Sequence, residues 1–127
     1  MKERQDIESY LGQMGLEWET IAEDMWRVAV RDEENLVVSL SGPVVVLRIK
    51  VMEAPAKNRE AFFERLLSLN TTDLMHGAFG LEGQSVVVVA ALALENLDFN
   101  EFQGAIDDIL LAIGKLYPEL AKFRDAA

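Results

Sequence analysis

The hydrophobic pattern of the chain changes its period repeatedly, and this succession limits the fold more than any other feature of the sequence. Apolar residues recur with helical spacing at residues 2–14, at residues 55–70 and from residue 98 onward. Four strand-like segments lie within residues 16–51, and two more lie within residues 75–94. Strands that follow one another through short turns pair antiparallel. The pattern therefore predicts an α+β fold in the order α-β-β-β-β-α-β-β-α, with an antiparallel sheet and helices packed mainly on one face.

Several residues indicate where the three helices begin and end. Gly15 follows the first helix as a terminator. Pro55 suits the first turn of the second helix, where its missing N–H costs nothing. Asp98 and Glu101 have the spacing of a capping box for the third helix, whose apolar residues share one face. Pro118 is expected to end or kink this helix.

Three glycines at three-residue spacing, Gly77, Gly80 and Gly83, raise the question of a phosphate-binding loop. Such a loop needs its glycines between a strand and the N-terminus of a helix. Here the glycines lead into an apolar strand, and no Lys or Arg lies between Arg65 and Lys115 to meet a phosphate. A tight turn is the better interpretation: Gly83 supplies a positive φ, while Gly77 and Gly80 let another element approach the strand closely.

Charge and composition exclude several functional classes. The 127 residues are expected to form one domain, residues 1–127, and their 22 acidic and 12 basic side chains give a formal net charge of −10. Nucleic acids and anionic membranes attract basic proteins, so neither is an expected partner. The absence of cysteine excludes disulfides and thiolate chemistry and fits a reducing compartment. With no apolar segment at the N-terminus and no apolar run longer than Val86–Leu94, a cytoplasmic protein is expected.

Residues that carry catalysis or bind metals are sparse. His76 is the only histidine, and a lone histidine beside a glycine is more often a surface residue than a base. Without cysteine or a second histidine, the usual zinc sites are excluded. Asp107 and Asp108 are adjacent on a predicted helix and do not face the same way, which favours a solvated face over a cation site. Neither a metal nor a cofactor is expected, and the chain is not expected to be an enzyme.

Apolar residues beyond the needs of one core predict an interface. Phe62 and Phe63 lie about 100° apart around the second helix, and with Leu66 and Leu67 they form a stripe too wide for the sheet of one chain to cover. These four residues are the predicted interface of a homodimer. The segment VVVVAALAL, residues 86–94, does not alternate, which predicts a strand covered on both faces. Helices on one face of a single sheet would leave part of the other face apolar, and such a patch is normally an interface.

The segment from Leu66 to Leu110 resembles the type III secretion chaperone-like fold, which CesT-type secretion chaperones share with YbjN-domain proteins. Its helix ends on a Leu-x-Leu-Asn-like sequence at residues 67–70, and a Gly-x-Phe-Gly-Leu-like strand follows at residues 77–81. An apolar strand and a Leu-Asp step then lead into a long amphipathic helix. The remaining chain matches in element order, and the sequence KLYPEL near the C-terminus favours the YbjN branch.

The resemblance implies a small acidic homodimer without catalytic activity. Such a chaperone-like protein holds an extended or amphipathic segment of a client protein through apolar patches and strand addition. YbjN-domain proteins are linked to regulation, so a second hypothesis stays open: a regulatory domain that binds a small molecule on its sheet face. The candidate partner-binding residues are basic and are predicted at outward strand positions, where plain surface charge is the alternative interpretation: Arg27, Arg31, Arg48 and Lys50.

Overall fold

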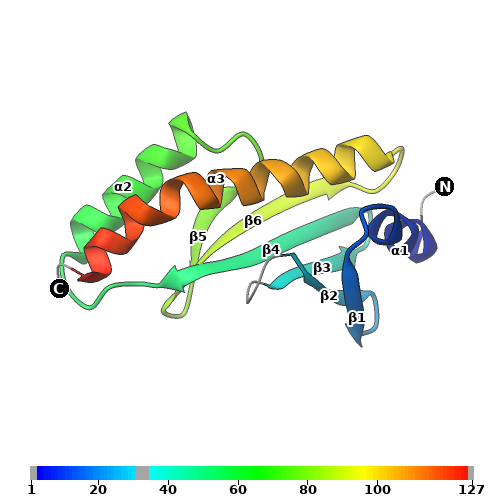
Figure 1. Cartoon of the computed structure of the whole chain (residues 1–127), viewed down its shortest axis with the longest axis horizontal. Helices are drawn as coiled ribbons and strands as arrows, with labels where there is room; N and C mark the ends of the chain where they lie inside the picture. The colour runs from blue at the N-terminus through cyan, green and yellow to red at the C-terminus, as the bar shows by residue number, and fades with distance from the viewer. Residues whose placement is uncertain (1–2, 31–34, 126–127) are drawn as a thin grey trace.

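The computed structural model describes residues 3–30 and 35–125, which form an antiparallel sheet with three helices on one of its faces (Figure 1). The helices are α1 (Arg4–Gln13), α2 (Arg59–Thr72) and α3 (Phe99–Asp125). The strands are β1 (Glu17–Ala22), β2 (Met25–Ala29), β3 (Asn35–Ser41), β4 (Val44–Glu53), β5 (Ala78–Glu82) and β6 (Ser85–Ala93). Their order in the sheet is β1-β2-β3-β4-β6-β5. The predicted α+β fold and its element order are confirmed.

The core lies between α3 and the centre of the sheet. Alternate residues of β4 and β6 face the helices and pair with one another, as in Val45↔Leu92, Leu47↔Ala90 and Ile49↔Val88. Against them α3 places buried residues at helical spacing, among them Phe102, Ile106, Ile109, Ile113 and Leu116. Burying each large apolar side chain contributes roughly 1.5–3 kcal/mol. This layer contact is therefore the main source of stability.

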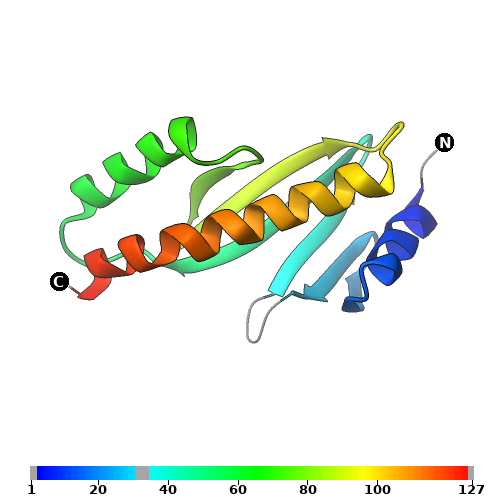
Figure 2. The same cartoon turned by 45° about the horizontal axis from the view of Figure 1, so that its top comes forward.

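Helix α1 packs beside the first turns of α3, as Figure 2 shows. The Tyr10 hydroxyl donates a hydrogen bond to the Leu97 carbonyl at 2.7 Å, and its ring centroid lies 5.6 Å from that of Phe102. The indole Nε1 of Trp26 in β2 donates to a Glu8 carboxylate oxygen at 2.9 Å. These contacts place α1 over the β1–β3 end of the sheet, on the same face as α3.

The start of α2 differs from the sequence prediction. The helix begins at Arg59, and Pro55 lies before it rather than in its first turn. Asn58, which directly precedes the helix, has a left-handed backbone with φ +56°, so the chain cannot enter the helix any earlier. Arg59 Nη1 donates a hydrogen bond back to the Pro55 carbonyl at 2.9 Å, which fixes this approach.

Helix α3 does not end at Pro118 but continues to Asp125. A proline inside a helix removes one backbone hydrogen bond, here the one to the carbonyl of Gly114. Leu116 and Leu120 are buried on either side of Pro118. Apolar burial on both sides of the proline offsets the lost bond, so the helix persists through it.

Ion pairs join α2 and the following turn to α3. Arg65 pairs with Glu119, and Lys115 Nζ lies 3.8 Å from Asp73 Oδ2. Hydrogen bonding from Arg65 holds the pKa of Glu119 below its ordinary value, and the same bond raises the pKa of Arg65. The two side chains of the Arg65–Glu119 pair are 43% and 39% exposed, so solvent screens the interaction.

We expect Glu119→Gln to lower the free energy of unfolding by less than about 1 kcal/mol at neutral pH. Because the pKa of Glu119 is lowered in the folded state, its contribution is present above the unfolded value of 4.5 and is lost as the pH falls through the folded pKa. The variant and the parent should therefore become equally stable in acid. Urea unfolding at pH 7 and pH 3 measures this, and a difference that stays the same at both pH values would contradict it.

Candidate partner-binding surfaces

Strand β1 forms one free edge of the sheet, and all six of its residues are exposed. Two large apolar side chains on it, Trp18 and Ile21, are each 38% exposed. Among the described residues, no side chain bonds to the β1 backbone. An exposed edge of this kind is a ready template for another strand.

The backbone groups of β1 that face outward can be assigned from the neighbouring ladder. The Leu40 N–H donates to the Asp24 carbonyl at 2.8 Å, which continues the β2–β3 register by one residue. Even-numbered residues of β2 therefore bond to β3. Trp18 and Thr20 stand opposite two of these residues. Their own N–H and C=O groups point away from β2, toward the free edge.

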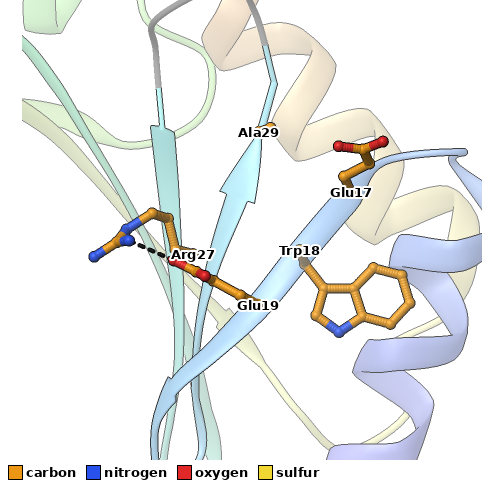
Figure 3. Close-up of a pocket in the computed structure, with 5 residues that line it drawn as sticks. All are labelled: Glu17, Trp18, Glu19, Arg27 and Ala29. Carbon is orange, nitrogen blue, oxygen red and sulfur yellow. Dashed lines mark hydrogen bonds and ion pairs between the residues drawn. The ribbon is translucent and has the colours of Figure 1, made fainter.

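A shallow cavity of about 230 Å³ borders this edge and is lined by Glu17, Trp18, Glu19, Arg27 and Ala29. Figure 3 shows Trp18 on the side of β1 that faces α1, while Glu19 and Arg27 form an ion pair on the opposite side. Small-molecule sites usually enclose about 300–1,000 Å³. The cavity has the size for a side chain of a bound segment rather than for a whole ligand.

The other free edge, β5, is occupied. The Phe79 N–H donates to Asn70 Oδ1 at 2.7 Å, and Asn70 Nδ2 donates to the Phe79 carbonyl at 3.4 Å. Asn70 lies in the last turn of α2, so the helix supplies a partner for the strand backbone. Sequence reasoning noted this asparagine only as part of a motif, because its partner follows from how α2 sits on the sheet.

The predicted basic residues lie on the sheet face that the helices leave open. Arg27, Val37 and Arg48 pair across β2, β3 and β4 in one row. Lys50 is on the same face of β4, two residues beyond Arg48. Arg31 lies outside the described residues. The structure thus brings three of the four residues onto a common face.

All three of these basic residues have carboxylate partners. Arg27 pairs with Glu19, Arg48 Nε lies 3.0 Å from Glu82 Oε1, and Lys50 pairs with Glu53. The hydrogen bond from Lys50 lowers the pKa of Glu53. The positive charge is therefore balanced locally, which leaves little of it to attract an anionic ligand.

Between these charges the open face is apolar. Its small aliphatic residues come from β3, β4 and β6: Val37, Val44, Val46, Val89, Ala91 and Ala93. The prediction that residues 86–94 are covered on both faces is only partly right. Val87 is 4% exposed on the open face, but Ala91 and Ala93 on the same face are exposed. The described helices all pack on the opposite face, so this patch has no helix over it.

The four residues of the predicted dimer interface differ in burial. Phe62 and Leu66 are 0% and 6% exposed and belong to the core of the single chain. Phe63 is partly buried beneath the Arg59 guanidinium, which lies 5.1 Å from its ring centroid. Leu67 is 67% exposed. Of the predicted stripe, Leu67 and the edge of Phe63 are open to a partner.

Of the three evenly spaced glycines, Gly77 and Gly83 have a positive φ and Gly80 does not. Gly83 has φ +60° in the β5–β6 turn, and Gly77 has φ +78°. A Cβ at Gly77 would lie 2.7 Å from the Val89 carbonyl oxygen, so the predicted close approach is confirmed there. The same prediction is wrong for Gly80, where a Cβ would meet only a Val87 methyl at an ordinary 3.9 Å.

His76 is not isolated, contrary to its lone place in the sequence. Its Nδ1 lies 2.8 Å from Asp108 Oδ2 on α3, and both side chains are partly exposed. Within residues 3–30 and 35–125, no group of three His, Cys, Asp or Glu side chains is placed to hold a metal ion. None of the described helices is long and apolar enough to cross a membrane.

Solved structures with this fold include secretion chaperones and YbjN. A chain of the heterodimeric ExoU–SpcU complex from the Pseudomonas aeruginosa type III secretion system matches with a TM-score of 0.72 at 16% identity, over 88% of this chain and 95% of its own. The Yersinia pestis chaperone SycH, in complex with a fragment of YscM2, gives 0.68 at 12% identity, over 89% and 98%. YbjN from E. coli gives 0.67 at 10% identity, over 94% and 96%.

Among proteins with curated functions, none is similar enough in sequence to count as a relative. The family model CesT_Tir_1, in contrast, matches residues 1–126, almost the whole chain. Members of this family are secretion chaperones without catalytic activity, which confirms that the chain is not an enzyme. The chain therefore belongs to the CesT/Tir family of type III secretion chaperones.

Proposed function

We propose that this protein is a chaperone-like, non-catalytic module that holds an extended or amphipathic segment of a partner protein in the cytoplasm. The observation that carries the proposal is the free edge of β1, where the backbone groups of Trp18 and Thr20 point outward beside exposed apolar side chains. Extended peptides gain affinity from backbone bonds along such an edge and specificity from alternate side chains in pockets. Membership of the CesT/Tir family supports the same assignment. Several solved structures that are similar to this chain are complexes of two different proteins.

Apolar burial should dominate the binding free energy in spite of the acidic surface. Exposed charge pairs contribute about 0–1 kcal/mol each, whereas a fully buried Leu-sized side chain contributes roughly 1.5–3 kcal/mol. The net charge of −10 would mainly change the rate at which a basic segment associates. A bound segment should therefore carry spaced Leu, Ile or Val residues.

The test is to capture the partner from native lysate, map the bound segment by protease protection, and titrate that segment as a peptide. We expect its affinity to fall only modestly between about 50 and 500 mM salt, because burial and backbone bonds are screened far less than charge pairs. A loss of several orders of magnitude would show that charge carries recognition and would contradict the mechanism.

We further propose that the protein is a homodimer whose interface includes the predicted stripe of Phe62, Phe63, Leu66 and Leu67. Leu67 and the edge of Phe63 would touch the partner, while Phe62 and Leu66 hold the helix on the sheet below. Two contacts fix the rotation of α2 about its axis: Arg65 pairs with Glu119 on α3, and Asn70 accepts a hydrogen bond from the backbone of β5. Leu67 then lies on the side of α2 away from α3.

Light scattering coupled to size exclusion should give a mass about twice 14.2 kDa for the parent protein. Leu67→Glu should give a monomer, because it places a charge in the interface. Leu111→Glu is the matched control, since Leu111 is equally exposed, at 70%, but lies on α3. A parent protein of 14.2 kDa would contradict the dimer, and a dimeric Leu67→Glu variant would contradict this interface.

The alternative of a small-molecule site on the sheet face has weaker support. The cavity that contains Arg27 measures about 230 Å³, and the basic residues on this face already pair with carboxylates. Small molecules recovered with the purified protein and released by Arg48→Ala would favour this alternative.

A further inference from the structure

The two free edges of the sheet are chemically different. At β5, one side chain, Asn70, both accepts from the Phe79 N–H and donates to the Phe79 carbonyl. This is the pair of bonds that an added antiparallel strand would make at that residue. At β1, the corresponding groups of Trp18 and Thr20 have no such side-chain partner among the described residues.

The register shows how much of the β5 edge Asn70 occupies. The Leu94 N–H donates to the Pro43 carbonyl at 2.8 Å, which continues the β4–β6 ladder. By alternation, odd-numbered residues of β6 bond to β5, and their partners are the even-numbered residues of β5. The outward-facing residues of β5 are therefore Phe79 and Leu81. Asn70 takes both groups of Phe79, so only Leu81 keeps outward groups for pairing.

We propose that Asn70 closes the β5 edge, so that strand addition is confined to β1. Proteins block sheet edges because an unpaired row of N–H and C=O groups pairs with other chains. A single remaining residue, Leu81, offers one bonded pair, too little to hold a strand. The assignment of β1 as the receiving edge rests on the proposed function, whereas the closure of β5 can be tested without any partner.

The experiment compares Asn70→Ala with the parent in hydrogen exchange and in sedimentation equilibrium at about 5–200 μM, with no peptide present. In the variant, the protection factor of the Phe79 amide should fall at least about tenfold relative to that of the Val88 amide in the neighbouring β6. The variant should also associate beyond the state of the parent as its concentration rises. Thr71→Ala is the matched control, because Thr71 lies on the same helix turn but its hydroxyl donates to the Ser68 carbonyl within the helix.

Two further variants identify the edge that associates. With Asn70→Ala, the outward N–H groups of β5 are those of Phe79 and Leu81. Leu81→Pro, added to Asn70→Ala, removes the second of these donors and places a proline ring on the edge, so it should restore the mass of the parent. Thr20→Pro, added to Asn70→Ala, acts on β1 and should leave the new association unchanged. Asn70→Asp keeps the acceptor for the Phe79 N–H but loses the donor to the Phe79 carbonyl. The Phe79 amide should therefore keep its protection in Asn70→Asp, which separates loss of the capping bond from a loss of folding.

Either of two results would overturn the proposal. One is a Phe79 amide that stays protected in Asn70→Ala. The other is a deprotected amide in a variant whose mass never departs from that of the parent. Because no client is present, neither result depends on whether the proposed partner binding is correct.

Discussion

Replacing Gly77 with alanine is expected to lower the free energy of unfolding by about 2–4 kcal/mol, the largest stability effect that we predict for one methyl group. The φ of +78° at this residue costs a non-glycine residue about 1–2 kcal/mol. The added Cβ would also lie 2.7 Å from the Val89 carbonyl oxygen and 3.1 Å from the Ala90 Cβ. These atoms belong to β6, which is paired on both sides and cannot move away cheaply.

Gly83→Ala separates the two causes. Gly83 also has a positive φ, +60°, but a Cβ there would have no atom within 4 Å apart from those of its two neighbours in the chain. Its cost should be about 1–2 kcal/mol, the backbone term alone. Urea unfolding of both variants measures the difference, and equal losses would mean that contact with β6 contributes nothing.

The same glycines show what the sequence could and could not predict. Their equal spacing gives Gly77, Gly80 and Gly83 equivalent places in the sequence. Only the register of β5 on β6 makes the first a close contact and leaves the second in ordinary van der Waals contact. The turn at Gly83 was predictable because a local turn needs a positive φ. The contact at Gly77 depends on a residue twelve positions away, so spacing alone could not separate it from Gly80.

Element order was predictable because it follows from local periodicity, whereas several boundaries depend on tertiary contacts. Pro118 is a strong local signal for the end of a helix, yet α3 continues because Leu116 and Leu120 remain buried against the core. Pro55 suits a helix start, but the left-handed Asn58 delays α2 to Arg59. In both cases packing or backbone conformation overrides propensity.

The candidate surfaces also combine features that the local sequence predicts with features that depend on the tertiary structure. An apolar stripe on α2 was predictable from the sequence, but which of its residues face the sheet was not, and Phe62 and Leu66 are buried there. Arg27, Arg48 and Lys50 lie on outward positions, as the sequence predicts, while their pairing with Glu19, Glu82 and Glu53 depends on the tertiary structure. Only the strand order makes β1 and β5 the free edges.

Thr20→Pro is expected to weaken binding of the captured partner segment by about 10- to 100-fold. The Thr20 N–H points to the free edge of β1, so a proline there removes a donor and places its ring where a strand would approach. The unpaired carbonyl left on the partner costs about 1–3 kcal/mol, which corresponds to this range because about 1.4 kcal/mol is a factor of ten. The fold should tolerate the change, since proline occurs on edge strands whose N–H faces solvent.

The affinity of that peptide for Thr20→Pro and for Leu81→Pro, measured by calorimetry beside the parent protein, is the most direct test of strand addition at β1. The two variants make the same change at outward positions of opposite edges, and circular dichroism confirms that both are folded. We expect a 10- to 100-fold loss of affinity in Thr20→Pro and parental affinity in Leu81→Pro. Parental affinity in a folded Thr20→Pro variant, or an equal loss in both variants, would contradict strand addition at β1.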